Sequence, residues 1–152
     1  MDQQAQVALE ILYKHTPEAK SLEQRAKGIL VFPDVVKAGL LVGAERGKGV
    51  LFENGKPTGY YSTTAISYGL QAGAQTFGYA MFLMSDYALN ELKTSSNFEL
   101  GVGPSVVLVD HGLAKTLSTT TLKSDIYAFI FHQRGLMAGI GLQGSKISRI
   151  NP

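Results

Sequence analysis

The sequence predicts an α+β fold, in which N-terminal helices precede an antiparallel-rich β-sheet or barrel-like sheet that carries one further short helix. Three observations predict it. Apolar residues repeat at three- and four-residue spacing within residues 3–15, as they do in an amphipathic helix. From residue 28 onward, apolar runs rich in β-branched and aromatic residues lie between glycines and prolines, which is typical of strands. The pair Asn54-Gly55 favours a tight hairpin turn between two such runs.

The first element is a helix expected over residues 3–15, where Val7, Ala8, Ile11 and Leu12 share one face. Pro17 suits the first position of a second short helix, so the helical part extends over residues 3–26. The apolar stripe of the first helix has two interpretations. It packs on the core of the protein, or it lies in a lipid interface.

A mainly β part follows over residues 28–150. Its expected strands before the next helix are residues 29–32, 38–42, 49–52, 58–67 and 69–82. Ser85 is a suitable N-cap for a short helix over residues 85–93. The strands expected after that helix are residues 98–103, 106–109, 126–131 and 136–142, and residues 117–121 are a polar bridge that forms a strand or a loop.

Length and composition predict a single domain over residues 1–152. The chain is 45% hydrophobic and 17% charged, which is an ordinary globular balance. It has no cysteine, so it has no disulfide and no thiolate metal site. The longest purely apolar stretch, Tyr79–Met84, is far shorter than the roughly 20 residues that cross a bilayer. The polar start is compatible with the mature part of an exported protein whose leader has been removed.

The formal net charge of +2 argues against broad electrostatic binding of nucleic acid. The charge is unevenly distributed, because residues 27–56 and 110–152 are net positive and the other two parts are net negative. The positive parts also hold the two glycine-rich segments. If these segments meet in the fold, their lysines and arginines form a patch for anionic headgroups; the alternative is that they are scattered over the surface as solvated side chains.

Motifs that suggest catalysis or metal binding are incomplete. Residues 139–144 match a dinucleotide fingerprint, but the chain ends eight residues later, without the required helix and acidic residue. Residues 43–49 lack the spacing and the Ser or Thr of a phosphate loop. His15, His111 and His132 lack ligand-like spacing, and no nucleophile elbow accompanies Asp110-His111. We therefore expect no enzyme, no cofactor and no metal.

Five segments occur in an order that resembles the SYLF domain, over about residues 8–150. They are Ala26-Lys27-Gly28-Ile29-Leu30-Val31-Phe32-Pro33, Lys37-Ala38-Gly39, Val42-Gly43 with Gly47-Lys48-Gly49-Val50-Leu51, Gly69-Leu70-Gln71-Ala72-Gly73-Ala74-Gln75, and Ile126-Tyr127 to Arg134-Gly135-Leu136-Met137-Ala138-Gly139 with Gly144-Ser145. The resemblance implies a lipid-binding module. Eukaryotic SYLF proteins bind phosphoinositides and membranes, and some bind actin.

The chain looks like the stand-alone bacterial form of this domain. The resemblance to that form implies export to a periplasmic or outer-membrane-associated location. In many relatives the precursor has an export signal or is lipidated. Actin is therefore not an expected partner of this chain. Tyr61-Ser62-Thr63-Thr64 stands where the family usually has tryptophan and Ser-x-Pro, and residues 110–115 lack the usual Gly-Pro-x-Gly-Arg. These departures favour phosphatidylglycerol or cardiolipin over phosphoinositides as the anionic lipid.

The sequence thus predicts a lipid-binding surface with an apolar and a basic part. The apolar part is the face of the first helix that carries Val7, Leu9, Ile11 and Leu12. The basic part comprises Lys14, Lys20, Arg25 and Lys27, followed by Lys37, Arg46, Lys48, Lys115, Arg134 and Lys146. The alternative function is a structural or assembly protein of the envelope, whose sheet makes contacts with other copies or with a protein partner.

Overall fold

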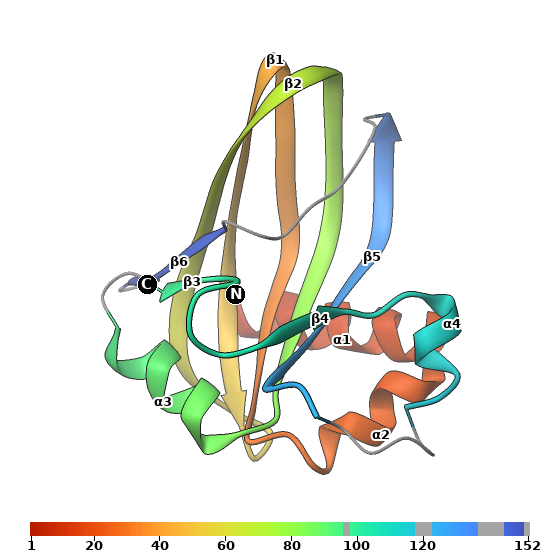
Figure 1. Ribbon diagram of the computed structural model, residues 1–152. Helices are drawn as coiled ribbons and strands as arrows, with labels where there is room; N and C mark the ends of the chain where they lie inside the picture. Colours follow the sequence, from red (N-terminus) through yellow and green to blue (C-terminus); the bar gives the residue numbers. More distant parts are fainter. Residues whose placement is uncertain (96–97, 118–122, 137–144, 151–152) are drawn as a thin grey trace.

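The computed structural model describes residues 1–95, 98–117, 123–136 and 145–150, and it describes the backbone alone at residues 40–41, 67–72, 111 and 135–136. The predicted α+β fold is confirmed (Figure 1). The elements, in chain order, are α1 Asp2–His15, the 3-10 helix η1 Pro17–Ala19, α2 Lys20–Glu23, β1 Gly28–Glu53, β2 Lys56–Leu83, α3 Asp86–Thr94, β3 Phe98–Glu99, β4 Val106–Leu108, α4 His111–Ala114, β5 Ile126–Leu136 and β6 Lys146–Ile150.

The N-terminal helices form where the sequence predicts them. In α1, Ala5, Ala8 and Leu12 recur at helical spacing and are buried. The helix ends before Thr16, and Pro17 begins η1, where its missing N–H costs no hydrogen bond. The side chain of Ser85 caps α3 by accepting a hydrogen bond from the backbone N–H of Ala88, as predicted.

A single long hairpin, β1 and β2, forms the centre of the fold. The two strands contain 26 and 28 residues and are joined at Asn54 and Gly55, whose φ angles of 54° and 79° are those of the predicted tight turn. The hairpin folds over at its far end, near Gly39 (φ 157°), where a Cβ atom would lie 2.1 Å from the carbonyl oxygen of Val42. Only glycine fits there. β1 therefore has a first limb, residues 28–38, and a second limb, residues 42–53.

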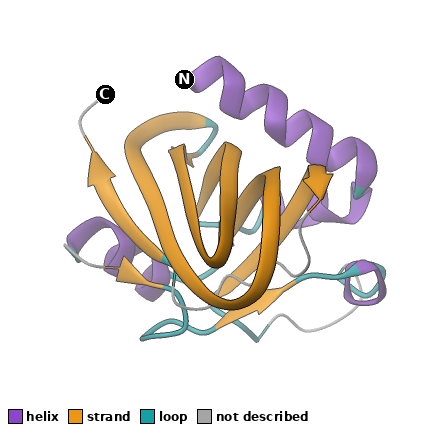
Figure 2. Cartoon of the chain, turned by 90° about the horizontal axis from the view of Figure 1, so that it is seen from above, coloured by secondary structure: helices purple, strands orange, loops and turns teal. Residues whose placement is uncertain are grey.

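β2 is the central strand of the sheet. It pairs antiparallel with β1 along most of its length, with β5 over residues 74–83 and with β6 over residues 60–64. β3 pairs antiparallel with β6, and β4 runs parallel to β5. Seen from above, the strands curl into an open half-barrel, and α1 lies against the outside of the curl (Figure 2).

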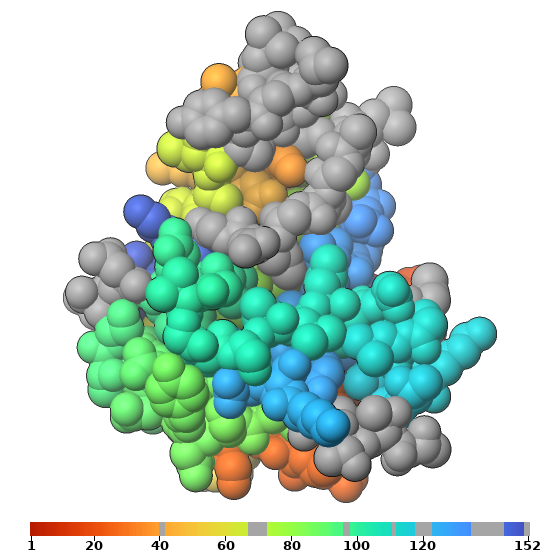
Figure 3. Space-filling model, viewed as in Figure 1, coloured from red at the N-terminus to blue at the C-terminus, as the bar shows by residue number. Residues whose placement is uncertain are grey.

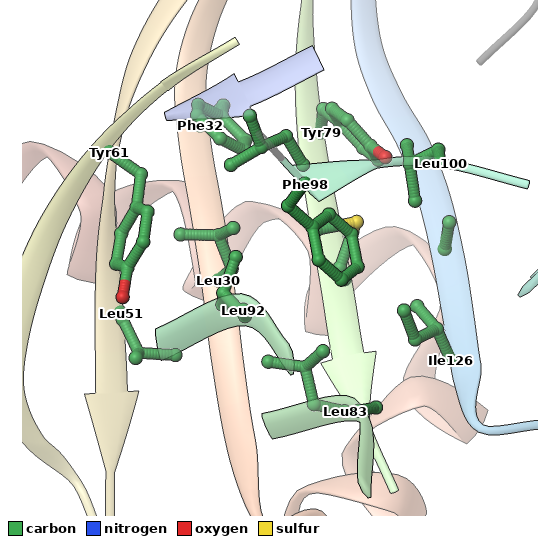
Figure 4. Close-up of a cluster of buried hydrophobic side chains, with 14 of the residues drawn as sticks. Leu30, Phe32, Leu51, Tyr61, Tyr79, Leu83, Leu92, Phe98, Leu100 and Ile126 are labelled. Carbon is green, nitrogen blue, oxygen red and sulfur yellow. The ribbon is translucent and has the colours of Figure 1, made fainter. Parts of the chain in front are cut away.

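Apolar side chains pack on both faces of the lower part of the sheet. On the inner face, Leu30, Phe32, Tyr79 and Met81 pack with residues of α3 and β3 (Figure 4). On the outer face, residues of β1, β2 and β5 pack with α1, α2 and their neighbours. The limbs of β1 approach closely, because a Cβ atom on Gly49 would lie 2.5 Å from the carbonyl oxygen of Val31. We call this lower part, residues 28–35, 46–64 and 77–83 with the elements packed on it, the body.

The upper part of the hairpin extends beyond the helices (Figure 1). We call it the arm and define it as residues 36–45 of β1 and 65–76 of β2. Lys37 and Glu45 are the only charged residues in these two ranges. They pair with each other inside the arm, with Nζ 3.6 Å from Oε1.

Several predicted strand boundaries need correction. The three short strands expected within residues 29–52 form one bent strand, and the two expected within residues 58–82 form another, because backbone pairing continues through the intervening glycines. The strand predicted for residues 98–103 ends at Glu99, where a turn begins. α4 and β6 were not predicted. Most of the predicted strand 136–142 and residues 118–121 of the polar bridge lie outside the described residues.

Candidate functional site

The candidate site lies on the outer face of the second limb of β1. Because side chains alternate along a strand, and residues directly opposite each other in the register share a face, Arg46 and Lys48 point to the same side as their partners on the neighbouring strands. Thr64 of β2 lies between Arg46 and Lys146 of β6. In the next row, Ser62 lies between Lys48 and Ser148.

These two rows form a basic face, defined by Arg46, Lys48 and Lys146 with the hydroxyl groups of Ser62, Thr64 and Ser148. The three cations are exposed. Arg46 and Lys48, two residues apart on one strand, are about 7 Å apart at the backbone, and the outer strands of the three are about 10 Å apart. Cations separated by such distances, with hydroxyl donors between them, suit the oxygens of a phosphate group.

A groove of about 630 Å³ runs along the basic face. Its lining includes Arg46 and Lys48, the hydroxyl-bearing segment of residues 62–64, and Gln4 of α1. Tyr60 positions α1 at the lower end of this groove by donating a hydrogen bond of 2.7 Å to the Asp2 carboxylate. That hydrogen bond raises the pKa of Tyr60, and Tyr60 therefore remains a neutral donor. Among the described side chains, none forms an ion pair with Arg46 or Lys48.

A second groove, of about 490 Å³, lies beside α1. It is lined by Val7 and Ile11 of the helix and by Phe131 and Arg134 of β5. Asp34, at the β-bulge of the first limb, borders both grooves and lies 3.7 Å from the Arg134 guanidinium. Both side chains of this pair are mostly exposed, so the pair contributes little to stability. Its main effect is to neutralise Arg134 beside the basic face.

The predicted apolar face of α1 needs correction. Leu12 is 1% exposed and packs in the core beneath the helix, because its position is on the same side as Ala5 and Ala8. Leu9 and Ile11 are partly buried against the same cluster. Val7 is 47% exposed and is the one member of the predicted set on the open surface. The stripe therefore packs mainly on the core of the protein, which was one of the two interpretations.

The predicted basic set is divided by the fold. Lys37 needs correction, because it is 5% exposed and pairs with Glu45 inside the arm. Lys20 lies over the ring of Tyr13, and Arg25 donates to the carbonyl of Leu117, so these two belong to the helical side of the molecule. The remaining predicted cations are exposed, namely Lys14, Lys27, Arg46, Lys48, Lys115, Arg134 and Lys146. Of these, Arg46, Lys48 and Lys146 share the basic face.

The hydroxyl residues of the basic face were not predicted as site residues. Alternation along Ser62, Thr63 and Thr64 could have placed Ser62 and Thr64 on one face. Their neighbours on β6 follow only from the long-range register. Within the described part of the chain, no group of three or more histidine and acidic residues is arranged to hold a metal ion. No described helix is long and apolar enough to cross a membrane.

A family model described as "Las17-binding protein actin regulator", Ysc84, matches residues 64–151, more than half of the chain. The matched part includes β5, β6 and most of β2, and therefore Thr64, Lys146 and Ser148 of the basic face. A comparison with curated proteins found no match. The single-domain organisation, the envelope location and the expectation that the chain is not an enzyme stay predictions.

Proposed function

The chain belongs to the Ysc84 (SYLF) family, and from this premise we propose that it binds the anionic headgroups of phospholipid membranes through the basic face. The family match confirms the resemblance based on the glycine-rich segments. Lipid-related and actin-regulating roles are known in this family. The proposal selects the first of these roles for this chain.

The observation that carries the proposal is the grouping of Arg46, Lys48 and Lys146 around the hydroxyl groups of Ser62 and Thr64. A cation near an anionic membrane surface contributes about 1 kcal/mol of attraction, so three contribute about 3 kcal/mol, or roughly a hundredfold in partitioning. The hydroxyl groups add donors for phosphate oxygens. Phosphatidylglycerol and cardiolipin are the proposed lipids, and Val7 of α1 adds an apolar contact beside the groove.

Co-sedimentation with vesicles tests this proposal. The Arg46→Glu, Lys48→Glu double variant and the unmodified chain are mixed with vesicles of phosphatidylcholine alone or with added phosphatidylglycerol. We expect the unmodified chain to bind the anionic vesicles and the variant to bind at least about 30-fold less at low salt, because two attractive charges of about 1 kcal/mol each are lost and two repulsive charges replace them. Binding of the unmodified chain is expected to weaken with salt, since screening at 0.15 M acts over about 8 Å.

The matched control is the Lys56→Glu, Lys123→Glu double variant, which makes the same change in net charge at two exposed lysines outside the basic face. An equal loss of binding in both variants would mean that net charge, and not the basic face, causes binding. Oligomers that form without lipid, together with no binding to any vesicle, would favour the alternative of an assembly protein. A parallel run with filamentous actin, in which we expect no co-sedimentation, tests the other role known in the family.

A further inference from the structure

The arm differs from the body in the polarity of its inner face, which packs apolar side chains in the body and polar side chains in the arm. Among the side chains of the arm that the structure describes, those that point outward are mostly apolar and small: Val36, Val42 and Ile66 are 44%, 53% and 68% exposed, and Ala38, Ala44 and Ala74 are exposed between them. Three of the described inward side chains are polar. Lys37, Glu45 and Gln75 are each less than 10% exposed, and Thr63 lies buried directly below them.

The polar interior explains how a part of the chain that extends from the body avoids presenting charge. Glu45 faces Lys37, and burial raises the pKa of Glu45 while the neighbouring ammonium offsets part of that rise. The hydroxyl of Tyr79, at the floor of this interior, is fully buried, and burial followed by the charge of Glu45 raises its pKa well above the usual value. Burying an ion pair is costly unless the partners are well matched. The arm nonetheless keeps both of its charges inside, whereas Val36, Val42 and Ile66 point outward.

The polarity of the outward side chains also changes along the second limb. On one face, the rows from the body to the tip are Lys48 with Ser62, Arg46 with Thr64, Ala44 with Ile66, and then Val42. Cationic and hydroxyl side chains thus lie directly below apolar ones, on the same strands. This order matches that of a lipid leaflet, in which anionic headgroups lie outside hydrocarbon. The atoms of β1 and β2 that extend above the body in Figure 3 belong to this arm.

The length of the arm matches the thickness of one leaflet of a bilayer. From Arg46 to residue 40, at the bend, the second limb rises six residues, or about 20 Å. The hydrocarbon core of a bilayer is about 30 Å thick, so one leaflet provides about 15 Å. An arm that binds headgroups at Arg46 therefore reaches the acyl chains of the near leaflet and is too short to cross the core.

We propose that the arm inserts among the acyl chains of the near leaflet, with Val36, Val42 and Ile66 in contact with hydrocarbon, while the basic face below it holds the headgroups. This inference rests on the proposed lipid-binding function and adds the part of the fold that enters the membrane. The occupant of the apolar surface is lipid, because the cations next to it are complementary to an anionic surface.

A single-cysteine experiment tests the insertion directly. The chain has no cysteine, so an Ile66→Cys variant carries a polarity-sensitive fluorophore at one place. A Val102→Cys variant, at a side chain that is 63% exposed in the body, is the control. With vesicles of phosphatidylcholine and phosphatidylglycerol, we expect a blue shift at residue 66 and quenching by spin labels on the acyl chains. At residue 102 we expect neither.

A second pair of variants measures how much the apolar side chains of the arm contribute to vesicle binding. We expect Val42→Ser with Ile66→Ser to reduce binding about tenfold or more at high salt, because two apolar side chains lose their contact with hydrocarbon. Val102→Ser with Leu108→Ser, a matched change at exposed positions of the body, is expected to change binding less than twofold. The thermal unfolding midpoint of each variant shows that it remains folded.

The outcomes separate this inference from the proposed function. A fluorophore at residue 66 that stays in water while the protein co-sediments with anionic vesicles overturns insertion and leaves headgroup binding in place. Failure of the unlabelled chain to bind any vesicle overturns both. A blue shift that occurs without vesicles and grows with protein concentration overturns insertion, because a second copy then covers the arm.

Discussion

The body and the arm are built from the same two strands, with the same alternation of side chains, yet their inner faces differ in polarity. In the body, Phe32 and Tyr79 face inward, stacked with ring centroids 5.6 Å apart. Five residues further along the first limb, Lys37 faces inward and is buried with Glu45. Alternation therefore specifies which side chains share a face, and the surroundings determine whether that face is apolar.

The surroundings differ because the helices cover only the body. There, α1 and α2 pack on one face of the sheet, and α3 with β3 packs on the other, so apolar residues on both faces are buried. On the arm, the outward apolar residues are exposed. An exposed apolar surface of this kind marks an interaction site more often than a defect. The two regions therefore allow a comparison between buried apolar residues, in the body, and exposed apolar residues, in the arm.

The largest expected effect is on the body. Phe82 is fully buried, with its ring centroid 5.3 Å from that of Phe129 and 6.4 Å from that of Tyr13. We expect Phe82→Ala to lower the free energy of unfolding by about 4 kcal/mol, because it leaves a cavity between the sheet and α1. We expect Ile66→Ala in the arm to lower it by less than about 0.5 kcal/mol. Urea denaturation of both variants measures the contrast, and equal losses would contradict it.

The sequence predicted the body far better than the arm, for physical reasons. The helix over residues 3–15 and the turn at Asn54-Gly55 depend on local spacing and on φ preferences, and both are confirmed. The prolines and glycines between residues 32 and 49 were interpreted as boundaries between three strands, whereas in the structure one strand continues through them and bends near Gly39, where only glycine fits. Local sequence does not distinguish these two outcomes.

The candidate site could be predicted only in part. Arg46, Lys48 and Lys146 were predicted individually from charge and position in the chain. Their grouping depends on the pairing of Thr64 with both Arg46 and Lys146, which is a long-range register. Lys37 was predicted in the basic set from its charge and its place beside a glycine-rich segment, but a lysine can be buried when it is paired. Its partner, Glu45, lies eight residues away in sequence and reaches it only when the hairpin folds over.

The next largest effect concerns the interior of the arm. We expect Lys37→Met to lower the free energy of unfolding by about 3 kcal/mol at neutral pH, because the Glu45 carboxylate is then buried without its cation. Burial already raises the pKa of Glu45, and loss of the lysine raises it further. In the folded state Glu45 therefore takes up a proton at a higher pH than in the unfolded state. The deficit of the variant is full above the raised pKa and shrinks as the pH falls towards the ordinary value of 4.5.

Denaturation curves of Lys37→Met between pH 4 and pH 8 measure this effect. The Lys37→Met, Glu45→Gln double variant is the matched control, since it removes both charges, and we expect it to recover most of the lost stability at neutral pH. A deficit that is independent of pH, or a double variant as unstable as the single one, would mean that the pair is not what holds the interior of the arm together.

The smallest of the three expected effects concerns a group of hydrogen bonds around Asp125 on the surface of the body. The Asp125 carboxylate accepts hydrogen bonds from the backbone N–H of Ser105 (2.9 Å) and from the hydroxyls of Ser85 (2.7 Å) and Ser105 (3.1 Å), which joins the start of α3 to the segments before β4 and β5. The backbone hydrogen bond from Ser105, followed by that from the Ser85 hydroxyl, lowers the pKa of Asp125, although partial burial opposes the shift.

We expect Asp125→Asn to lower the free energy of unfolding by about 1 kcal/mol at neutral pH, because charge-assisted hydrogen bonds at a partly exposed site become neutral ones. Since the folded pKa lies below the unfolded one, the contribution of Asp125 is present above the ordinary value of 3.8 and is lost as the pH falls through the folded pKa. Thermal unfolding of both proteins at pH 7 and in acid measures it. The two curves should converge in acid, and a constant gap would assign the loss to packing instead of charge. These hydrogen bonds lie in the body, away from the basic face and the arm. Vesicle binding by the folded variant should therefore equal that of the unmodified chain.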